Sequence, residues 1–557
     1  MPKLTIDGRT VEVAAGTNLI EAARAAGIEI PFFCYHPYLT VVGQCRICMV
    51  EIQGQPRLAV ACATPAAEGM VVKSETSERA KEAREAVMEF LLANHPLDCP
   101  VCDQAGECLL QDHSMEEQRA TFTTHMTETR RTFPGYESRL IGPHVIQNQN
   151  RCIHCSRCIR FTQEISETSA LTYKSRGNST LIDTFDGKPF EDPMSGCAAD
   201  VCPVGALTVR GFRFRKRAWK LRSTPSICPG CSIGCNIFIE HHERVVYRFS
   251  PRENPGVNAT WLCDYGRFLA ESLNEQAYLH PQRRVSGQLA RATWGEALPA
   301  LSTELKAARS LRVVASANLS NEELYLAREL FGRHLKGEIV VPVFPGEPRR
   351  MKNGKREWLT STDAHPNSHG ARRLGLATVD GEGLVRFFRG AAGTTVILDP
   401  SAHPSLASEE ALQALGRGPL VAFARAKHPV ADLAGWLLPT PSLASNEGTF
   451  VSSTGSVQRF APAFAPPGTV HRTATGAMSP TCPTIASPWG PPGEARPLWV
   501  VLSSLAREMG VETLDLSSPA DVFALMARTE ESFAGLDWEE LGGQREQSSY
   551  RERQHVG

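Results

Sequence analysis

The order of hydrophobic and polar residues divides this chain into regions with different predicted secondary structure. Alternation in "LTIDGRTVEV" predicts a β-hairpin that turns at Asp7 and Gly8. The next segment, "TNLIEAARAAG", predicts a helix that begins with a capping box of Asn18 and Glu21 and ends at Gly27. A loop and further strand are expected in "CRICMVEIQGQPRLAVACATP". These elements together predict a small β-grasp unit.

A longer helix is predicted over residues 76–94, where Val87, Phe90 and Leu91 recur at helical spacing. Between residues 119 and 222, in contrast, periodicity is weak and the cysteines lie in predicted turns. Regular secondary structure is therefore expected to be sparse in this middle region.

After about residue 275 the sequence pattern predicts alternating strands and helices, as in α/β domains. Buried strands are predicted at 311–317 ("LRVVASA"), 394–400 and 419–425, because each is a short apolar run. A helix is predicted after the first of these strands, with Ser320 and Glu323 as its capping box. Another helix is expected in "LWVVLSSLAREMG".

The rest of the C-terminal half contains few patterns that predict regular secondary structure or a binding motif. Residues 461–497 include nine prolines and are expected to be irregular, and the polar tail after about residue 538 is expected to be mobile. The chain contains neither GxGxxG nor GxxxxGK[ST] and no convincing internal repeat. The sequence therefore gives no indication that this chain itself binds a nucleotide.

Composition and charge narrow the class of protein. The chain has 557 residues, 42% of them hydrophobic, and a formal net charge of −1, so several globular domains are expected and anionic partners are not. The segment "GFRFRKRAWKLR" (211–222) is basic, but without a wider basic face we interpret it as an exposed strand or linker. The N-terminus lacks the pattern of a secretory signal, and no apolar run is long enough to span a membrane. A cytosolic chain that reaches membranes through partners is predicted.

The number and positions of the cysteines are the main indication of the chemistry of this chain. Of the 17 cysteines, 16 lie at or before Cys263 and only Cys482 follows. In a reducing compartment, cysteines at this density favour metal binding over disulfides. The N-terminal half is therefore predicted to carry metals.

The first ligand set has one CxxC and two outlying cysteines, spaced x10, x2 and x13. This is the general form of a [2Fe–2S] site, although plant ferredoxins have a first gap of four residues. A zinc site is the alternative, and His36 is interpreted as a neighbour rather than a ligand. The predicted ligands are Cys34, Cys45, Cys48 and Cys62.

The second set, in "HPLDCPVCDQAGECLL", has the spacing His-x3-Cys-x2-Cys-x5-Cys. Taken alone it fits a Cys3His zinc site as well as an iron–sulfur site in which imidazole replaces one thiolate. The predicted ligands are His95, Cys99, Cys102 and Cys108.

The third set is the most specific. "CIHCSRC" followed by a remote "CPVGAL" is the bacterial [4Fe–4S] pattern, in which a distant Cys-Pro supplies the fourth ligand. Cys197 competes for the fourth place, but the proline context favours Cys202; His154 is interpreted as a packing or hydrogen-bonding residue. The predicted ligands are Cys152, Cys155, Cys158 and Cys202.

The fourth set has the spacing x2, x3 and x27, which again suits a [4Fe–4S] cubane, with a zinc ribbon as the alternative. Its predicted ligands are Cys228, Cys231, Cys235 and Cys263. The four sets leave only Cys197 and Cys482 unassigned. Four separate zinc sites explain the pattern poorly, because one set contains the ferredoxin-type Cys-Pro loop.

In this order the four sets resemble the G subunit of bacterial NADH:quinone oxidoreductase, which is the large iron–sulfur subunit of respiratory complex I, over residues 1–275. Weaker similarity continues in "ATWGEALPAL" and "EGTFVSSTGSVQRFAPAFAPPG", which resemble parts of a molybdopterin-oxidoreductase domain. The resemblance implies one [2Fe–2S] and three [4Fe–4S] clusters. It also implies electron transfer from a flavin/NADH-binding subunit toward quinone, with other iron–sulfur subunits of complex I as partners.

The resemblance also implies a location and a fold. The chain would lie peripherally on the cytoplasmic side of the bacterial inner membrane, without contacts to nucleic acid. The implied fold class is α+β and α/β multidomain. The expected domains are a β-grasp [2Fe–2S] ferredoxin domain (1–77), a His(Cys)3-ligated [4Fe–4S] domain (78–118), a ferredoxin-like [4Fe–4S] domain (119–220), a [4Fe–4S] domain of the Mo/W-oxidoreductase type (221–277) and a shortened molybdopterin-oxidoreductase-like α/β domain (278–557).

The C-terminal region departs from the family pattern. It is short for a molybdopterin domain, and Ser452, Thr454 and Ser456 stand where the family often has Asn, Glu and Arg. We therefore expect a domain without molybdopterin, which serves folding and assembly. The alternatives are a subunit of an NAD-linked formate dehydrogenase, which the short C-terminus disfavours, and the electron-input subunit of a hydrogenase, which the fourth set followed by α/β sequence fits poorly. A zinc-dependent scaffold is the non-redox alternative.

Overall fold

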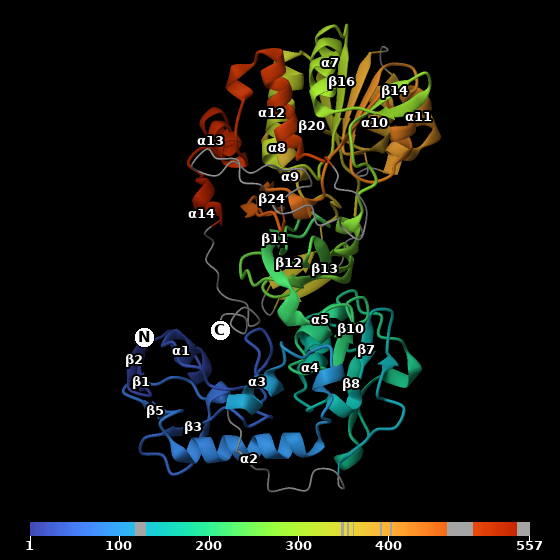
Figure 1. Ribbon diagram of the computed structural model, residues 1–557. Coiled ribbons are helices and arrows are strands. Elements are labelled where there is room, and N and C mark those ends of the chain that lie inside the picture. Colours follow the sequence, from blue (N-terminus) through green and yellow to red (C-terminus); the bar gives the residue numbers. More distant parts are fainter. Residues whose placement is uncertain are drawn as a thin grey trace. The chain divides into compact units, whose positions relative to one another are not determined.

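A computed structural model describes residues 1–116, 130–346, 350–353, 356–359, 361–389, 393–400, 404–464 and 494–542. The described residues form two compact units, which meet in the sequence between Leu221 and Arg222; the segment Arg350–Trp358 groups with the first unit (Figure 1). Cys482, most of the proline-rich segment and the tail from residue 543 lie outside the described residues.

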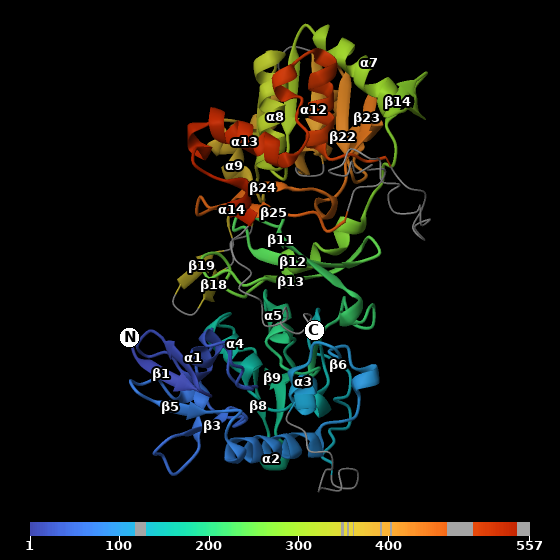
Figure 2. The same ribbon diagram turned by 60° about the vertical axis from the view of Figure 1, so that its left-hand side comes forward.

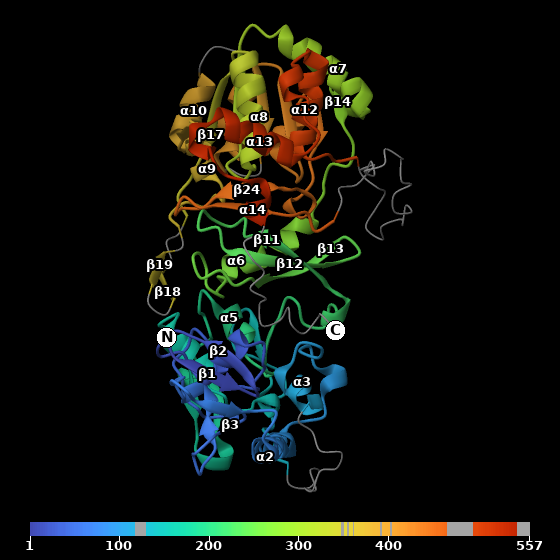
Figure 3. The ribbon, with the colours of Figure 1, turned by 90° about the vertical axis from the view of Figure 1, so that its left-hand side faces the viewer.

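The first unit opens with the predicted β-grasp sheet. Its hairpin turns at Asp7 and Gly8, which adopt φ angles of 44° and 81°, so the predicted turn is confirmed. The sheet has the strand order β2-β1-β5-β3-β4 and mixes parallel and antiparallel pairs (Figure 3). Its strands are β1 (Lys3–Ile6), β2 (Arg9–Glu12), β3 (Met49–Ile52), β4 (Ala59–Val60) and β5 (Val71–Lys73).

Helix α1 (Leu19–Ala25) packs on this sheet with Leu19 and Ile20 buried. Asn18 caps it as predicted, since its side chain accepts a hydrogen bond from the Glu21 backbone N–H at 3.0 Å. The Glu21 carboxylate, however, accepts from the Arg24 guanidinium and the Tyr35 hydroxyl. Only one half of the predicted capping box is therefore formed.

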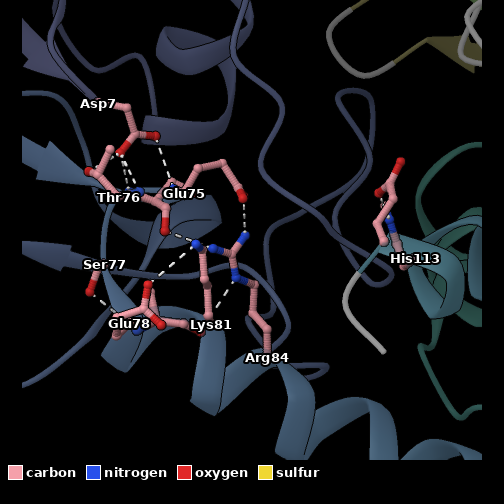
Figure 4. Close-up of polar contacts among 11 residues, drawn as sticks. Asp7, Glu75, Thr76, Ser77, Glu78, Lys81, Arg84 and His113 are labelled. Carbon is pink, nitrogen blue, oxygen red and sulfur yellow. Dashed lines mark hydrogen bonds and ion pairs between the residues drawn. The ribbon is translucent and has the colours of Figure 1, made fainter. Parts of the chain in front are cut away.

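Helix α2 (Glu78–Asn94) confirms the second predicted helix, and Val87 and Leu91 of its predicted apolar face pack against a buried core, but Phe90 does not. Phe90 is 77% exposed, whereas Ala80, Arg84 and Met88 are buried. These three residues recur every four positions and so form one stripe along the helix. The Arg84 guanidinium lies inside this stripe because it pairs with the Glu75 carboxylate at 2.8 Å (Figure 4).

The rest of the first unit consists of short elements, as the weak periodicity predicts. They are α3 (Leu109–Glu116), β6 (Arg139–Leu140), β7 (Val145–Gln147), α4 (Arg157–Glu164), β8 (Leu171–Lys174), β9 (Leu181–Thr184), α5 (Ser195–Asp200) and β10 (Leu207–Val209). The basic segment 211–222 contains turns and one short 3-10 helix, and β-structure begins only at its last residue. Of the two interpretations of this segment, the linker fits and the exposed strand does not.

The second unit starts with a three-stranded antiparallel sheet of β11 (Arg222–Ile227), β12 (Asn236–His242) and β13 (Val245–Pro251), followed by the short helix α6 (Asp264–Phe268). An eight-stranded sheet follows, in the order β15-β14-β23-β22-β21-β16-β17-β20 (Figure 2). Its strands are β14 (Gln282–Val285), β15 (Gln288–Arg291), β16 (Leu311–Ala315), β17 (Glu338–Pro342), β20 (Ala377–Val379), β21 (Thr394–Leu398), β22 (Leu420–Ala424) and β23 (Trp436–Pro439). The three strands predicted in this region are confirmed as β16, β21 and β22.

The six strands from β16 to β23 in this sheet are parallel, and counted along the chain they have the order 6-5-4-1-2-3. This is the doubly wound arrangement of dinucleotide-binding domains, although the sequence lacks the glycine-rich motif that such domains use for phosphate. Alternate residues of five of these strands, β16, β17, β21, β22 and β23, enter two separate cores, for example Val313 in one and Val314 in the other. Burial on both faces explains why these strands are mostly apolar.

Helices cover both faces of this sheet. One face carries α7 (Trp294–Lys306), α8 (Asn321–Ala327) and α12 (Leu498–Met509), and the other carries α10 (Gly381–Arg389) and α11 (Glu409–Leu415) (Figure 1). Ser320 and Glu323 form the complete predicted capping box at the start of α8. The predicted helix α12 ends at Gly510, whose φ of 78° is readily adopted by glycine. None of the helices in the described part of the chain is long and apolar enough to cross a bilayer.

Candidate metal centres

All sixteen cysteines in the described part of the chain are free thiols. One small apolar core of the first unit contains or contacts cysteines from three predicted ligand sets: Cys45 of the first, Cys108 of the second, and Cys152 and Cys202 of the third. Residues separated by more than a hundred positions thus share one water-poor environment.

The first set lies between the β-grasp sheet and this core. Cys34, Cys48 and Cys62 are buried, each 1% exposed, and the Cys45 backbone N–H points at the Cys34 sulfur at 3.4 Å. Hydrogen bonds that Cys45 and Cys62 donate to neighbouring sulfurs, together with burial, raise the pKa of both thiols far above the usual range. Four thiols held this close cannot all ionise unless a cation joins them. His36 accepts a hydrogen bond from the Tyr38 backbone N–H at 3.3 Å.

The second set begins at the C-terminal end of α2. His95 caps that helix, and burial lowers its pKa to about 4, so the imidazole is neutral and suited to bind a metal. Its Nδ1 atom is buried without a hydrogen-bond partner in the described residues. Burial also raises the pKa of Cys102 and that of Cys108, the latter to about 12. Cys99 is exposed.

The third set lines a cavity together with Gln147, Gln149 and apolar side chains of the same core. Burial raises the pKa of all four thiols, that of Cys202 to about 11, and neighbouring thiols add to the shift. Cys202 lines the cavity, whereas Cys197 is a fully buried residue of α5 that is not among its lining residues. The cavity-lining cysteines are Cys152, Cys155, Cys158 and Cys202.

The backbone of the third set wraps tightly around its cavity. His154 and Ser156 have positive φ angles of 53° and 61°, which turn the chain between successive cysteines. The Nε2 atom of the His154 side chain lies 2.9 Å from the Thr180 carbonyl. Its role here is hydrogen bonding, in line with the interpretation from the sequence.

The second and third sets are joined by the loop that follows Cys202. The Leu109 backbone N–H donates to the Pro203 carbonyl at 3.1 Å. A Cβ atom placed on Gly205 would lie 2.2 Å from the Cys102 sulfur, so only glycine fits at this position. The glycine of "CPVGAL" therefore lets one ligand loop approach a ligand of the neighbouring set.

The fourth set lies in the second unit, in a core of its own. The Cys228 backbone N–H donates to the Cys235 carbonyl at 2.8 Å, and a Cβ on Gly266 would lie 2.6 Å from the Cys228 sulfur and 3.7 Å from that of Cys263. Burial, reinforced by the neighbouring thiols, raises the pKa of Cys228, Cys231 and Cys235, that of Cys231 to about 11.

The α/β domain holds the loop of this fourth set. The Ser232 backbone N–H donates to the Asp363 carbonyl at 3.2 Å, and the Gln458 amide donates to the Gly234 carbonyl at 3.1 Å. Gln458 belongs to the hairpin of β24 (Gly448–Val451) and β25 (Val457–Phe460), and Ser452 of its turn lies against Gly234. The segment in which this chain departs from the family pattern therefore packs on the fourth set.

The donors of all four sets suit iron–sulfur clusters. Soft thiolates favour iron with sulfide, and burial of thiols that ionise only with difficulty favours a bound cationic core. In the described residues, no three or more His, Cys, Asp or Glu side chains are placed to hold a single metal ion. A cluster differs from a single ion because its ligands surround several metals and bridging sulfides.

Family comparisons match this arrangement set by set. Residues 2–77 match the "2Fe-2S iron-sulfur cluster binding domain" and residues 84–120 the "NADH-ubiquinone oxidoreductase-G iron-sulfur binding region". Residues 142–208 match "NADH-quinone oxidoreductase subunit 3, ferredoxin-like domain" and residues 221–275 the "Molybdopterin oxidoreductase Fe4S4 domain". Fold and sites thus define a protein with [2Fe–2S] and [4Fe–4S] cluster-binding domains in series.

Comparison with curated proteins finds relatives among subunits of NADH oxidoreductases. The chain is 40% identical over 317 residues to the G subunit of NADH-quinone oxidoreductase from Rickettsia bellii, an alignment that covers 57% of this chain and 46% of the relative. It is 39% identical over 335 residues to the mitochondrial NADH-ubiquinone oxidoreductase 78 kDa subunit of Candida albicans, covering 59% and 46%. Over its iron–sulfur region this chain is similar to the G subunits of NADH-quinone oxidoreductases and to their mitochondrial counterparts. The chain spans about half the length of the curated relatives it matches.

One solved structure with detectable similarity is an NAD+-reducing [NiFe]-hydrogenase in the H2-reduced state. The identity is 31%, the alignment covers 39% of this chain and 90% of that chain, and the TM-score is 0.34. A TM-score this low does not establish a common fold over the aligned region.

Proposed function

We propose that this chain is an electron-relay subunit in the peripheral arm of a proton-pumping NADH:quinone oxidoreductase. In this proposal it receives single electrons from the flavin/NADH-binding subunit and passes them through its iron–sulfur clusters toward quinone. The first set, Cys34, Cys45, Cys48 and Cys62, would hold a [2Fe–2S] cluster. The second set (His95, Cys99, Cys102, Cys108), the third (Cys152, Cys155, Cys158, Cys202) and the fourth (Cys228, Cys231, Cys235, Cys263) would each hold a [4Fe–4S] cluster.

The observation that carries this proposal is the apolar core that thiols of the first three sets share. When bound, clusters supply one-electron carriers whose potentials depend on ligands, hydrogen bonds and exposure to solvent. The chain supplies the surroundings. Phe33, Ile47 and Val204 are buried in the shared core and exclude water between the ligand loops. Carriers in a common dry region are suited to transfer over short distances.

Partners, location and the C-terminal domain follow from the same proposal. As a member of the peripheral arm, the chain would bind the flavin subunit and other iron–sulfur subunits and reach the membrane only through them. The α/β domain would hold the fourth set in place and support assembly without molybdopterin. The contacts of Ser232 and Gln458 at the fourth-set loop support that role.

Metal and cofactor analysis of the purified full chain tests the proposal. We expect about 14 irons per chain with matching sulfide, no stoichiometric zinc and no molybdenum, and EPR signals of both binuclear and cubane clusters after reduction. Stoichiometric zinc at any set would contradict that set's assignment. Bound molybdenum would instead favour the formate dehydrogenase alternative, and co-purification with a hydrogenase subunit would favour the other.

The histidine of the second set offers a sharper test. Imidazole is neutral where cysteine would supply an anionic thiolate, so it leaves the cluster less negative and raises its potential, as histidine ligands do in Rieske centres. His95→Cys should therefore keep a cluster and lower its midpoint potential, measured by EPR during a redox titration. An unchanged or raised potential with full iron content would contradict the assignment of His95 as a ligand.

A further inference from the structure

Two buried arginines on α4 lie between the first and third ligand sets. Arg157 and Arg160 are 4% and 5% exposed, and both flank Cys158 in the sequence. A buried charge is costly unless an opposite charge or a set of hydrogen bonds compensates it. The partners of these two guanidinium groups therefore indicate what they serve.

Arg160 contacts the backbone of both sets at once. Its Nη2 donates to the carbonyl of Cys34 at 2.5 Å and to that of Cys155 at 3.4 Å. Its Nη1 donates to the Thr40 carbonyl, and the Thr40 backbone N–H donates to the Glu164 carboxylate at 2.8 Å. One turn of α4 thus holds the loop that carries Cys34.

Arg157 repeats this bridging role one turn earlier on the helix. Its Nη2 donates to the carbonyl of Tyr35, next to Cys34, and its Nη1 donates to the carbonyl of Val201, next to Cys202, at 3.2 Å. Together the two arginines bind backbone carbonyls beside ligands of both sets.

No hydrogen bond or ion pair joins either guanidinium to a carboxylate in the described residues; Glu164 attracts Arg160 only at longer range. Burial lowers the pKa of Arg160, and the ionised sulfurs of Cys155 and Cys34 oppose that shift more strongly than the Glu164 carboxylate does. Arg84 provides the contrast, because it is equally buried but pairs with the Glu75 carboxylate. The countercharge of the α4 arginines is therefore expected to come from the ligand sets.

We propose that Arg160, supported by Arg157, is a shared positioning residue whose positive charge sets the reduction potentials of the first-set and third-set clusters together. This inference rests on the proposed function, since it requires both sets to hold clusters. Thiolate and sulfide make each cluster a net anion, and reduction adds one further negative charge. A buried cation beside both ligand loops favours the reduced form at each site.

The test is a redox titration followed by EPR on the full chain, with iron and sulfide measured on each sample. Arg160→Met, which removes the charge, should lower both midpoint potentials, so that the reduced-to-oxidised ratio at a fixed solution potential falls about tenfold at each site. In Arg160→Lys, which keeps the charge, the reduced-to-oxidised ratio should fall less at both sites. Arg160→Gln replaces the methionine variant if that variant does not retain its clusters.

Arg84→Met is the matched control, because it removes an equally buried guanidinium that has its own carboxylate partner. It should reduce stability and leave both potentials unchanged. The inference is overturned if Arg160→Met with full iron content leaves the potentials unchanged, shifts only one of them, or shifts them no more than Arg160→Lys. If the unsubstituted chain itself lacks two distinct cluster signals, the proposed function fails, and the two failures are thus distinguishable.

Discussion

The cysteine-rich first unit and the α/β domain of the second unit are stabilised in different ways. In the α/β domain, one core combines alternate residues of five parallel strands with helices such as α7, α8 and α12, and a second core covers the opposite face of the sheet. Burial of this much apolar surface is sufficient to stabilise a domain without metal. In the first unit, the core that joins the ligand sets is small and consists partly of the ligand cysteines.

Because of this difference, metal binding and folding are expected to be coupled in the first unit. Buried thiols such as Cys108 and Cys202 have raised pKa values, so metal binding, which ionises them, is linked to the structure around them. The α/β domain has no such dependence on metal in its two main cores. The two regions should therefore respond oppositely to loss of iron and to mutation of apolar side chains.

Removal of iron should give the largest effect. We expect a chelator under reducing conditions to abolish the protection of amide hydrogens around the third set and α4. Those segments lose the bound cluster that holds them together. Amides of β16, β21 and β22 should remain protected. Hydrogen-exchange mass spectrometry measures both regions in one sample, and equal loss in both would refute the comparison.

Shortening a buried side chain in the sheet core should destabilise the α/β domain and leave iron binding in the first unit unchanged. Leu398 of β21 is fully buried, so Leu398→Ala should lower the free energy of unfolding of the α/β domain by about 2–5 kcal/mol. Iron bound by the first three sets should stay the same. Denaturant unfolding monitored by tryptophan fluorescence, combined with iron analysis, checks both; loss of iron from the first unit would show that the regions do not fold independently.

A buried carboxyl gives the α/β domain a pH dependence of its own. Glu322 is fully buried beneath Thr449, whose backbone N–H donates to it at 2.8 Å, and burial raises its pKa from 4.5 to about 7. The folded state thus retains the proton that the unfolded state releases, so this contribution to stability is full below pH 4.5 and disappears as the pH rises through about 7. It is on the order of 3 kcal/mol.

Glu322→Gln, which is neutral at every pH, should remove that part of the pH dependence. Unfolding curves between pH 4.5 and 8 measure it, and Glu382→Gln on the exposed surface of α10 is the control. A slope unchanged by Glu322→Gln would show that another group titrates in this range.

The smallest effect is expected at a helix end. Thr293 forms a complete capping box with Glu296 at the start of α7, with the Glu296 backbone N–H donating to its hydroxyl at 3.2 Å. Thr293→Ala should cost about 1 kcal/mol of unfolding free energy and leave iron binding unchanged. Thermal unfolding resolves a change of this size, and Thr293→Ser, which keeps the cap, should be close to neutral.

Sequence patterns predicted those elements that are set by local interactions. The hairpin at Asp7 and Gly8, the capping box of Ser320 and Glu323, and the strands β16, β21 and β22 depend on neighbouring residues and on runs of one polarity. The pattern of α2 predicted only part of its buried face. Val87 and Leu91 pack against a core as expected, but Arg84 is also buried, because it pairs with Glu75. A periodicity argument places arginine outside and Phe90 inside, and both positions are the reverse in the structure.

For the candidate metal centres, too, local features could be predicted from the sequence and long-range contacts could not. Ligand spacing along the chain is a local property, so the four sets could be proposed from cysteine positions. The partners of Arg157 and Arg160 are set by how α4 packs against a loop more than a hundred residues earlier, and nothing in their own sequence neighbourhood indicates it. The strand order of the α/β sheet was likewise beyond reach, because the motif that usually accompanies it is absent.

The contact of Gly205 with the Cys102 sulfur has a consequence for biogenesis. The wall against which this ligand of the second set lies is built by the loop that follows Cys202 of the third set. A newly made chain that has not closed the third-set loop lacks that wall, so the two sites are expected to mature as a pair and not one after the other. If the two sets hold clusters as proposed, insertion of both clusters would be one cooperative step of assembly.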